Sequence, residues 1–219
     1  MSTPLLPQSF WFRIAASCQR MDGLPLHTGK RLLALPESCR LPQTSLLDGK
    51  PPWAEVRVAW NPQGLAVAVE AEGKLEALAD DRPESLYALQ LWVDTRDTRD
   101  VARATRFCHR FEARLAPGPS KSTLSVHVQQ RPIARAVADA PLCSPDLFQV
   151  RADRLKSSWR LELFLPAHAF NGFDPETNRR LGFTYQVTDP ARPDEFLGIT
   201  REFPVGENPS LWSTLELVD

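Results

Sequence analysis

Proline is the feature that most constrains what this chain can fold into, because 20 of its 219 residues are prolines spread along most of its length. Proline removes a backbone hydrogen-bond donor and clashes with the preceding turn of a helix. A long helical bundle or a coiled coil is therefore disfavoured. Between the prolines, short stretches alternate between apolar and polar residues, which is typical of β-strands.

One pair of alternating stretches predicts a β-hairpin. The stretches cover residues 56–60 and 65–70, and Asn61-Pro-Gln-Gly64 between them has the proline and glycine of a tight turn. Successive side chains of a strand point to opposite faces, so each stretch has one apolar face.

Similar patterns recur at short intervals and indicate an all-β fold. Roughly ten strands predict an antiparallel β-sandwich or jelly roll with at most short helices, one of them a helical turn at 166–170. Residues 1–53 are expected to form an irregular N-terminal lead-in segment that packs on the core, and residues 54–219 the sandwich, as one domain overall. Beyond the hairpin, strands are predicted at 10–14, 87–94, 107–115, 124–128, 148–152, 158–164, 181–189 and 211–217.

Composition and charge argue against several classes of protein. The chain has 26 basic and 27 acidic residues, so a strongly basic surface for nucleic acid is not expected. No stretch reaches the ~18 consecutive apolar residues of a membrane span. The N-terminus lacks a basic region followed by an apolar one, which is not typical of a secretory signal, and we expect a cytoplasmic protein.

The cysteines do not have the spacing of a metal site. Cys18, Cys39, Cys108 and Cys143 include no Cys-x-x-Cys pair, so a zinc finger is not predicted. We expect buried free thiols, as is usual in a cytoplasmic protein. If the protein is exported, Cys18 and Cys39 are candidates for a disulfide.

Five motifs follow one another from the hairpin to the C-terminus. They are the hairpin 56–69, Leu89-Gln-Leu-Trp-Val-Asp94, Trp159-Arg-Leu-Glu-Leu-Phe-Leu-Pro166, Leu181-Gly-Phe-Thr-Tyr-Gln-Val-Thr-Asp189 and Pro209-Ser-Leu-Trp-Ser-Thr-Leu215. In order and spacing they resemble the carbohydrate-binding module family 9-like domains, which are close to the DOMON-like β-sandwiches.

The resemblance implies a non-catalytic module that binds a carbohydrate or a similar polar ligand, usually by stacking a sugar ring on aromatic side chains. Some relatives of this family hold a haem through methionine and histidine. The methionines here, Met1 and Met21, both lie in the lead-in segment, so no haem is expected. The alternatives are a structural or protein-interaction domain without sugar binding and, ranked lower, a glycoside hydrolase-like enzyme.

Trp92 is the aromatic residue that we predict to face a ligand. In the stretch 87–94 the aliphatic residues share one face, and Trp92 lies on the other. The alternative is that Trp92 belongs to the core between two sheets, since large aromatic residues dominate cores. The predicted ligand-binding residues are Trp92, Gln90, Asp94, Arg96, Arg110 and Glu162.

The loop after this strand carries three aspartates at three-residue spacing. Asp94, Asp97 and Asp100 offer oxygen ligands for calcium. Arg96 and Arg99 lie between them and neutralise their charge, so a loop held by arginine–aspartate pairs is the favoured interpretation. A further alternative is that the arginines bind an anionic ligand such as an acidic sugar or a phosphate.

Glu162 corresponds to the glutamate in the aromatic-x-x-Glu-x-x-Ile-Pro segment of the resembled family. It shares a strand face with Arg160, so an inter-strand ion pair with an arginine is favoured over acid–base chemistry of the glycosidase kind. Cys108 and His109 are neighbours on a strand and point to opposite faces, so they form no nucleophile–base pair. His109 is expected to be a hydrogen-bonded core or pocket histidine, and no catalytic residue is predicted.

Overall fold

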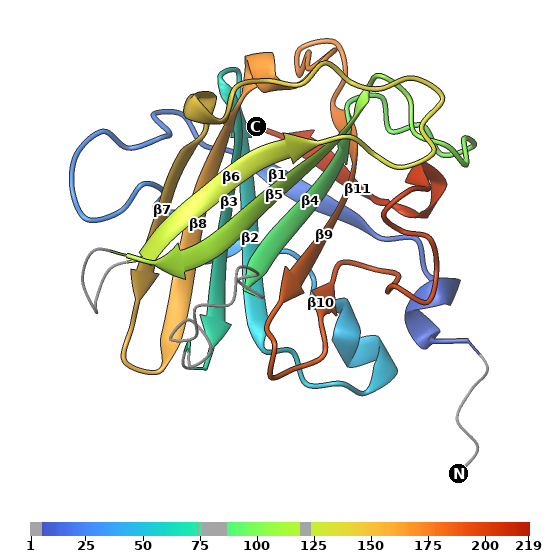
Figure 1. Ribbon diagram of the computed structural model, residues 1–219. Helices are drawn as coiled ribbons and strands as arrows, with labels where there is room; N and C mark the ends of the chain where they lie inside the picture. The colour runs from blue at the N-terminus through green and yellow to red at the C-terminus, as the bar shows by residue number, and fades with distance from the viewer. Residues whose placement is uncertain (1–5, 74, 76–86, 119–123) are drawn as a thin grey trace.

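The computed structural model describes residues 6–73, 75, 87–118 and 124–219, and these form an all-β protein, as predicted (Figure 1). The described helical segments are short 3-10 turns, and none is long and apolar enough to cross a membrane. They are η1 (Gln8–Trp11), η2 (Glu37–Cys39), η3 (Thr44–Asp48), η5 (Pro145–Leu147), η6 (Ala167–Ala169) and η7 (Pro209–Leu211).

The strands match the alternating stretches closely. In chain order they are β1 (Ala15–Arg20), β2 (Ala54–Asn61), β3 (Gly64–Glu72), β4 (Ala88–Asp94), β5 (Cys108–Pro117), β6 (Leu124–Arg131), β7 (Gln149–Arg154), β8 (Ser158–Pro166), β9 (Arg180–Thr188), β10 (Glu195–Phe196) and β11 (Ser213–Val218). The predicted hairpin is confirmed, with Val58 of β2 opposite Val67 of β3. At its turn only glycine fits, because a Cβ atom on Gly64 would lie 2.1 Å from the carbonyl oxygen of Leu165.

One hydrogen-bonded path links ten strands in the order β6-β5-β4-β9-β11-β1-β2-β3-β8-β7, and β10 pairs with β9. The path curls so that its two end strands, β6 and β7, come close together (Figure 1). Most neighbours are antiparallel, but β1 runs parallel to both β11 and β2. The prediction of an antiparallel β-sandwich or jelly roll is therefore confirmed only in part: the fold is all-β, but the sheet is mixed and nearly closed on itself. Parallel pairing requires long connections, and the one between β1 and β2 spans residues 21–53.

The lead-in segment is less irregular than predicted. The expected strand at 10–14 is wrong, because residues 8–11 form η1 and the strand lies at 15–20 instead. After β1 the segment is irregular, as predicted, and covers the outer side of β2, β3 and β8. There Leu24, Leu33 and Leu35 pack with alanines of the hairpin and with Phe164.

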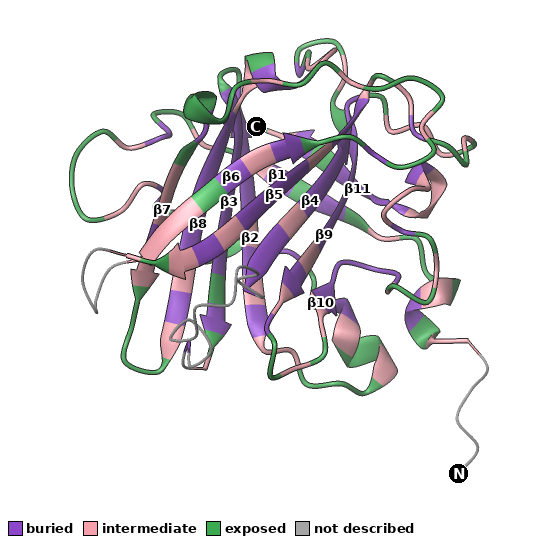
Figure 2. Cartoon of the chain, viewed as in Figure 1, coloured by how far each residue is buried: buried purple, intermediate pink, exposed green. Residues whose placement is uncertain are grey.

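The main core lies between two layers of strands. In Figure 1, β6, β5, β4 and β9 lie in front of β7, β8, β3 and β2. Apolar residues from both layers form one buried cluster, among them Val58, Val67, Leu91 and Leu161. Figure 2 shows this burial along the strands, with exposed residues gathered mostly in the loops. All four cysteines are free thiols, and Cys143 is the one that is only partly buried.

Candidate functional site

The register of the front layer places four polar side chains side by side. Gln90 of β4 lies opposite Glu112 of β5 and Gln186 of β9, and Glu112 lies opposite Gln129 of β6. The neighbouring residues along these strands, such as Leu89, face the core, so alternation points the four outward. We call Gln129, Glu112, Gln90 and Gln186 the outer-face row.

Two arginines hold Glu112 of the row in place. Arg114 donates to Glu112 Oε1 at 3.0 Å, and Arg131 donates to Oε2 at 3.3 Å. Burial alone would raise the pKa of Glu112, but the hydrogen bonds and charges of Arg114 and Arg131 lower it. Glu112 is therefore ionised and is already bound within the protein at neutral pH.

A third arginine, Arg110, is free of ion pairs with the described carboxylates. Its Nη2 donates to Gln90 Oε1 at 2.6 Å, and its buried Nε has no hydrogen-bond partner. Burial lowers the pKa of Arg110, but an arginine keeps its charge at neutral pH. Three arginines therefore lie beside the row and outweigh the charge of Glu112, and Arg110 is the one that forms no ion pair with a described carboxylate.

Trp92 lies beside the row, but its ring does not face solvent. It is 3% exposed and packs with Val205 and Trp212. A Cβ atom on Gly206 would lie 3.4 Å from its ring, and the guanidinium carbon of Arg110 lies 5.7 Å from its centroid. Trp92 is thus on the outer side of the sheet, as predicted, but the prediction of an open aromatic face is wrong. The segment between β10 and β11 covers the ring.

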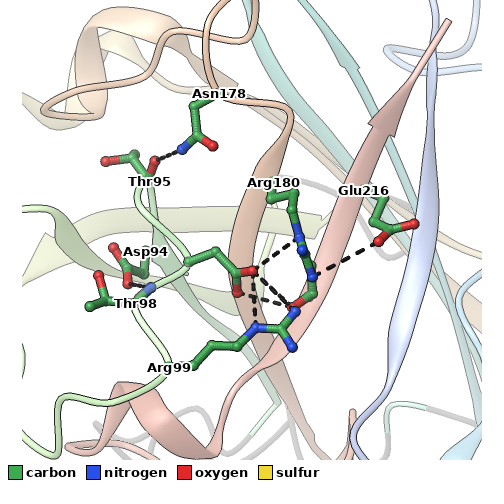
Figure 3. A network of polar contacts seen from close by, with 9 residues as sticks. Asp94, Thr95, Thr98, Arg99, Asn178, Arg180 and Glu216 are labelled. Carbon is green, nitrogen blue, oxygen red and sulfur yellow. Dashed lines mark hydrogen bonds and ion pairs between the residues drawn. The ribbon is translucent and has the colours of Figure 1, made fainter.

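The aspartate loop is held by its own hydrogen bonds. Asp94 is 1% exposed and accepts from the backbone N–H groups of Arg96 at 3.0 Å and Thr98 at 2.7 Å. Asp97 forms ion pairs with Arg99 at 3.2 Å and Arg180 at 3.4 Å. Figure 3 labels the two arginines and draws their contacts as dashed lines. This is the arginine–aspartate loop that was the favoured interpretation.

The calcium alternative gains no support from this arrangement. Arginines and backbone donors occupy the carboxylates of Asp94 and Asp97, while Asp100 is exposed. Among the described residues, no group of three or more histidines, cysteines, aspartates or glutamates is placed to hold a metal ion. Arg96 lies over the ring of Phe107, with 4.7 Å between the guanidinium carbon and the ring centroid, and it does not join the outer-face row.

Glu162 is inaccessible to a ligand, so its prediction as a binding residue is wrong. It is completely buried, because the lead-in segment lies over it. Arg31 Nε donates to its Oε1 at 2.5 Å, and the backbone N–H of Leu32 donates to Oε2 at 2.7 Å. The favoured ion pair with an arginine is present, but the arginine comes from the lead-in segment and not from a neighbouring strand.

The fold is similar to those of solved structures that include the following two. Both are family 9 carbohydrate-binding modules from Caldicellulosiruptor kristjanssonii, one in complex with cellotriose and one with glucose. The cellotriose complex is 16% identical with a TM-score of 0.51, and the match covers 75% of this chain and 74% of that one. The glucose complex is 14% identical with a TM-score of 0.56, covering 94% of this chain and 96% of that one.

This chain has the fold of a family 9 carbohydrate-binding module. Its sequence matches no protein-family model and no curated protein. Within the family 9 fold, three predicted residues lie together, namely Gln90, Trp92 and Arg110. Asp94 follows on the same face of β4, but its carboxylate is bound by the loop, and Arg96 and Glu162 lie elsewhere. The sequence analysis missed Glu112, Gln129 and Gln186 as members of the row. Their alternation with core residues was the available signal, but it does not reveal which strands are neighbours.

Proposed function

We propose that this protein is a non-catalytic module that binds a carbohydrate on its outer-face row. The observation that carries the proposal is the alignment of amide and guanidinium groups across neighbouring strands of a family 9 fold. Two modules of that fold were solved in complex with cellotriose and glucose, which supports a ligand of the same class for this chain.

The chemistry of the row suits sugar hydroxyl groups, which both donate and accept hydrogen bonds. A glutamine amide also does both, and an arginine guanidinium supplies a fork of donors. Gln90, Gln186 and Arg110 are all partly exposed and come from three adjacent strands. Side chains on strands keep their positions better than those on loops, so they present a prepared surface to a ligand.

We propose binding without hydrolysis. Glycoside hydrolysis needs a pair of carboxyl groups roughly 5–9.5 Å apart on either side of the scissile bond. On this face Glu112 is engaged by two arginines, and Asp194 is engaged by Gln186 and Arg201. Glu162 lies on the other layer, beneath the lead-in segment. We therefore expect no turnover of aryl glycosides by the wild-type protein.

Replacement of Arg110 by alanine tests the proposed site. We expect titration calorimetry with cellotriose and glucose to show binding to the wild type and at least about tenfold weaker binding to Arg110→Ala, since a hydrogen bond from a charged group contributes ~1.5–3 kcal/mol. Arg151→Ala is the matched control, because Arg151 lies on β7 and pairs with Asp153. Gln90→Ala is a second variant, in which Arg110 still lies over the ring of Trp92.

Two outcomes would count against the proposal. If Arg110→Ala, Gln90→Ala and the control bind the sugars with equal affinity, the sugar does not bind at the row. A wild-type protein that binds neither sugar at millimolar concentration would favour a structural or protein-interaction domain, which the burial of Trp92 also suits.

A further inference from the structure

A polar cleft lies on the outer face of the back layer, on β2, β3 and β8. Its floor contains Glu55, Glu70 and Arg160, which lie side by side in the register of the three strands. One lobe has a volume of about 830 Å³ and the next about 240 Å³. Both lobes are lined by Glu55, Arg57 and Glu70, so they form one elongated groove, which we call the Trp53 groove.

An indole ring forms one wall of the wider lobe. Trp53 is partly buried, and its Nε1 donates to the carbonyl oxygen of Pro193 at 2.9 Å, which fixes the orientation of the ring. The guanidinium carbon of Arg192 lies 5.6 Å from the ring centroid. Arg192 lines the groove and forms no ion pair with a described carboxylate.

The charges on the floor of the groove are paired with one another. Glu55 forms ion pairs with Arg40 at 3.2 Å and Arg57 at 2.5 Å, and Glu70 with Arg160 at 3.1 Å. The groove therefore contains many donors and acceptors but no large excess of one charge. An apolar ligand would leave these groups without water or partners, which is unfavourable. A strongly charged ligand would meet repulsion from some of them.

We propose that the Trp53 groove is a second carbohydrate-binding site, which takes a neutral oligosaccharide of more than one sugar unit. A neutral sugar offers hydroxyl groups to the arginines and glutamates, and apolar C–H groups to the part of the Trp53 ring that lines the groove beside Arg192. The wider lobe lies in the upper part of the ~300–1,000 Å³ range of ligand sites, and the second lobe extends it along the sheet.

The groove and the outer-face row lie on different layers of strands, with the core between the layers. The segment 192–194 contacts both, since Arg192 lines the groove and Asp194 accepts from Gln186 of the row at 3.1 Å. With both sites occupied, one molecule would hold two saccharide segments on opposite faces. Such bivalent binding raises the overall affinity for a polymer or a sugar-covered surface beyond that of either site.

Replacement of Trp53 tests the groove in the full-length protein. We expect cellotriose to shift the Nε1–H nuclear magnetic resonance signal of Trp53, and Trp53→Ala to weaken cellotriose binding at one of two sites at least about tenfold. Trp11→Ala is the matched control, because Trp11 lies in η1 and is 66% exposed. Binding of cellotriose that neither shifts the Trp53 signal nor weakens in Trp53→Ala would overturn the proposal.

A second variant separates loss of the groove from loss of folding. Trp53 also packs against the main core, whereas the side chain of Glu70 is 51% exposed, so Glu70→Ala is expected to fold normally. It should weaken the same cellotriose site and leave the Arg110-dependent site unchanged. If Arg110→Ala abolishes all cellotriose binding and Glu70→Ala changes none, the groove is not a sugar site although the proposed function holds.

The ionic strength and the charge of the probe test the neutral character of the ligand. Binding of cellotriose to the groove should be unchanged when sodium chloride is raised tenfold, because salt screens only interactions between charges. A groove that binds an acidic oligosaccharide better than cellotriose, with an affinity that salt reduces, would contradict the proposal.

Discussion

His109 shows how burial sets the chemistry of a single side chain. It is 1% exposed on the inner face of β5, between the rings of Phe111 and Phe170. The backbone N–H of Asn171 donates to its Nε2 at 3.0 Å, and Nε2 of Gln130 lies 3.1 Å from its Nδ1. The prediction of a hydrogen-bonded core histidine is confirmed. Burial lowers the pKa of His109 to about 4, so the ring is neutral at physiological pH.

The stability of the fold should therefore fall on acidification, and His109 should account for part of the loss. In the unfolded chain His109 takes up a proton near its ordinary pKa of 6.5, whereas in the folded protein it does so near 4. Between these two pH values the unfolded state binds more protons than the folded state. The contribution of neutral His109 to the stability of the fold is therefore complete above pH 6.5 and is lost as the pH falls towards 4. Between pH 7 and pH 5 we expect a loss of about 2 kcal/mol from this group.

Urea unfolding at the two pH values measures this loss. His109→Gln removes the titrating group, so its free energy of unfolding should change less between pH 7 and pH 5 than that of the wild type. His127→Gln is the control, since His127 is exposed on β6. An equal pH dependence in wild type and His109→Gln would show that His109 does not titrate as described.

At the scale of elements, one buried carboxylate helps to hold the irregular lead-in segment to the sheet. Glu162 is in the middle of β8, and both its oxygens accept hydrogen bonds from Arg31 and Leu32. Nearby, Leu33 and Leu35 are buried against the outer side of the hairpin. The segment thus covers apolar residues on the back layer and forms part of the rim of the Trp53 groove.

Glu162→Gln should loosen this attachment. The variant keeps the shape of the side chain but loses the charge that Arg31 contacts, and we expect a loss of ~1–3 kcal/mol in the free energy of unfolding. Trypsin should also cleave faster after Lys30 and Arg31. Glu37→Gln, an exposed change in the same segment, is the control. Stability and cleavage rates like those of the control would mean that the other contacts, namely the apolar packing and the hydrogen bonds from Asn61 and Arg57, hold the segment.

At the scale of the whole molecule, β1 pairs the N-terminal part of the chain with the last strand, β11. It pairs with β11 on one side and with β2 on the other, both in parallel. Cys18 of β1 is completely buried in the main core. Without β1, the hydrogen-bonded path of strands would break between β11 and β2 and expose their edges.

A chain that begins at Asp22 should therefore fail to fold cooperatively. Loss of β1 removes its ladder and part of the core, which we expect to cost most of the ~5–15 kcal/mol that stabilises a typical domain. Circular dichroism during heating measures the transition. A chain that begins at Gln8 keeps η1 and β1 and is expected to melt like the full chain. A sharp transition in the shorter chain would show that the sheet closes without β1.

The sequence predicted the strands well, because the two-residue period of a strand is a local signal. The hairpin of β2 and β3 followed from two alternating stretches and the turn between them. The position of β1 was predicted wrongly: the aromatic residues 10–12 suggested a strand, while the small residues of β1 carry a weaker pattern. Its parallel pairing depends on contacts with residues 59–60 and 214–218, which no local pattern encodes.

The sequence by itself determined an all-β fold, the inner and outer faces of most strands and the side of β4 on which Trp92 lies. Only the tertiary structure decided what is accessible on the outer faces. Val205 and Trp212, far along the chain, cover Trp92, and the lead-in segment covers Glu162. The Trp53 groove likewise combines Arg40, Glu70 and Arg192 from distant segments. Alternation specifies the face of a strand on which a side chain lies, but contacts between distant segments determine whether that face is open.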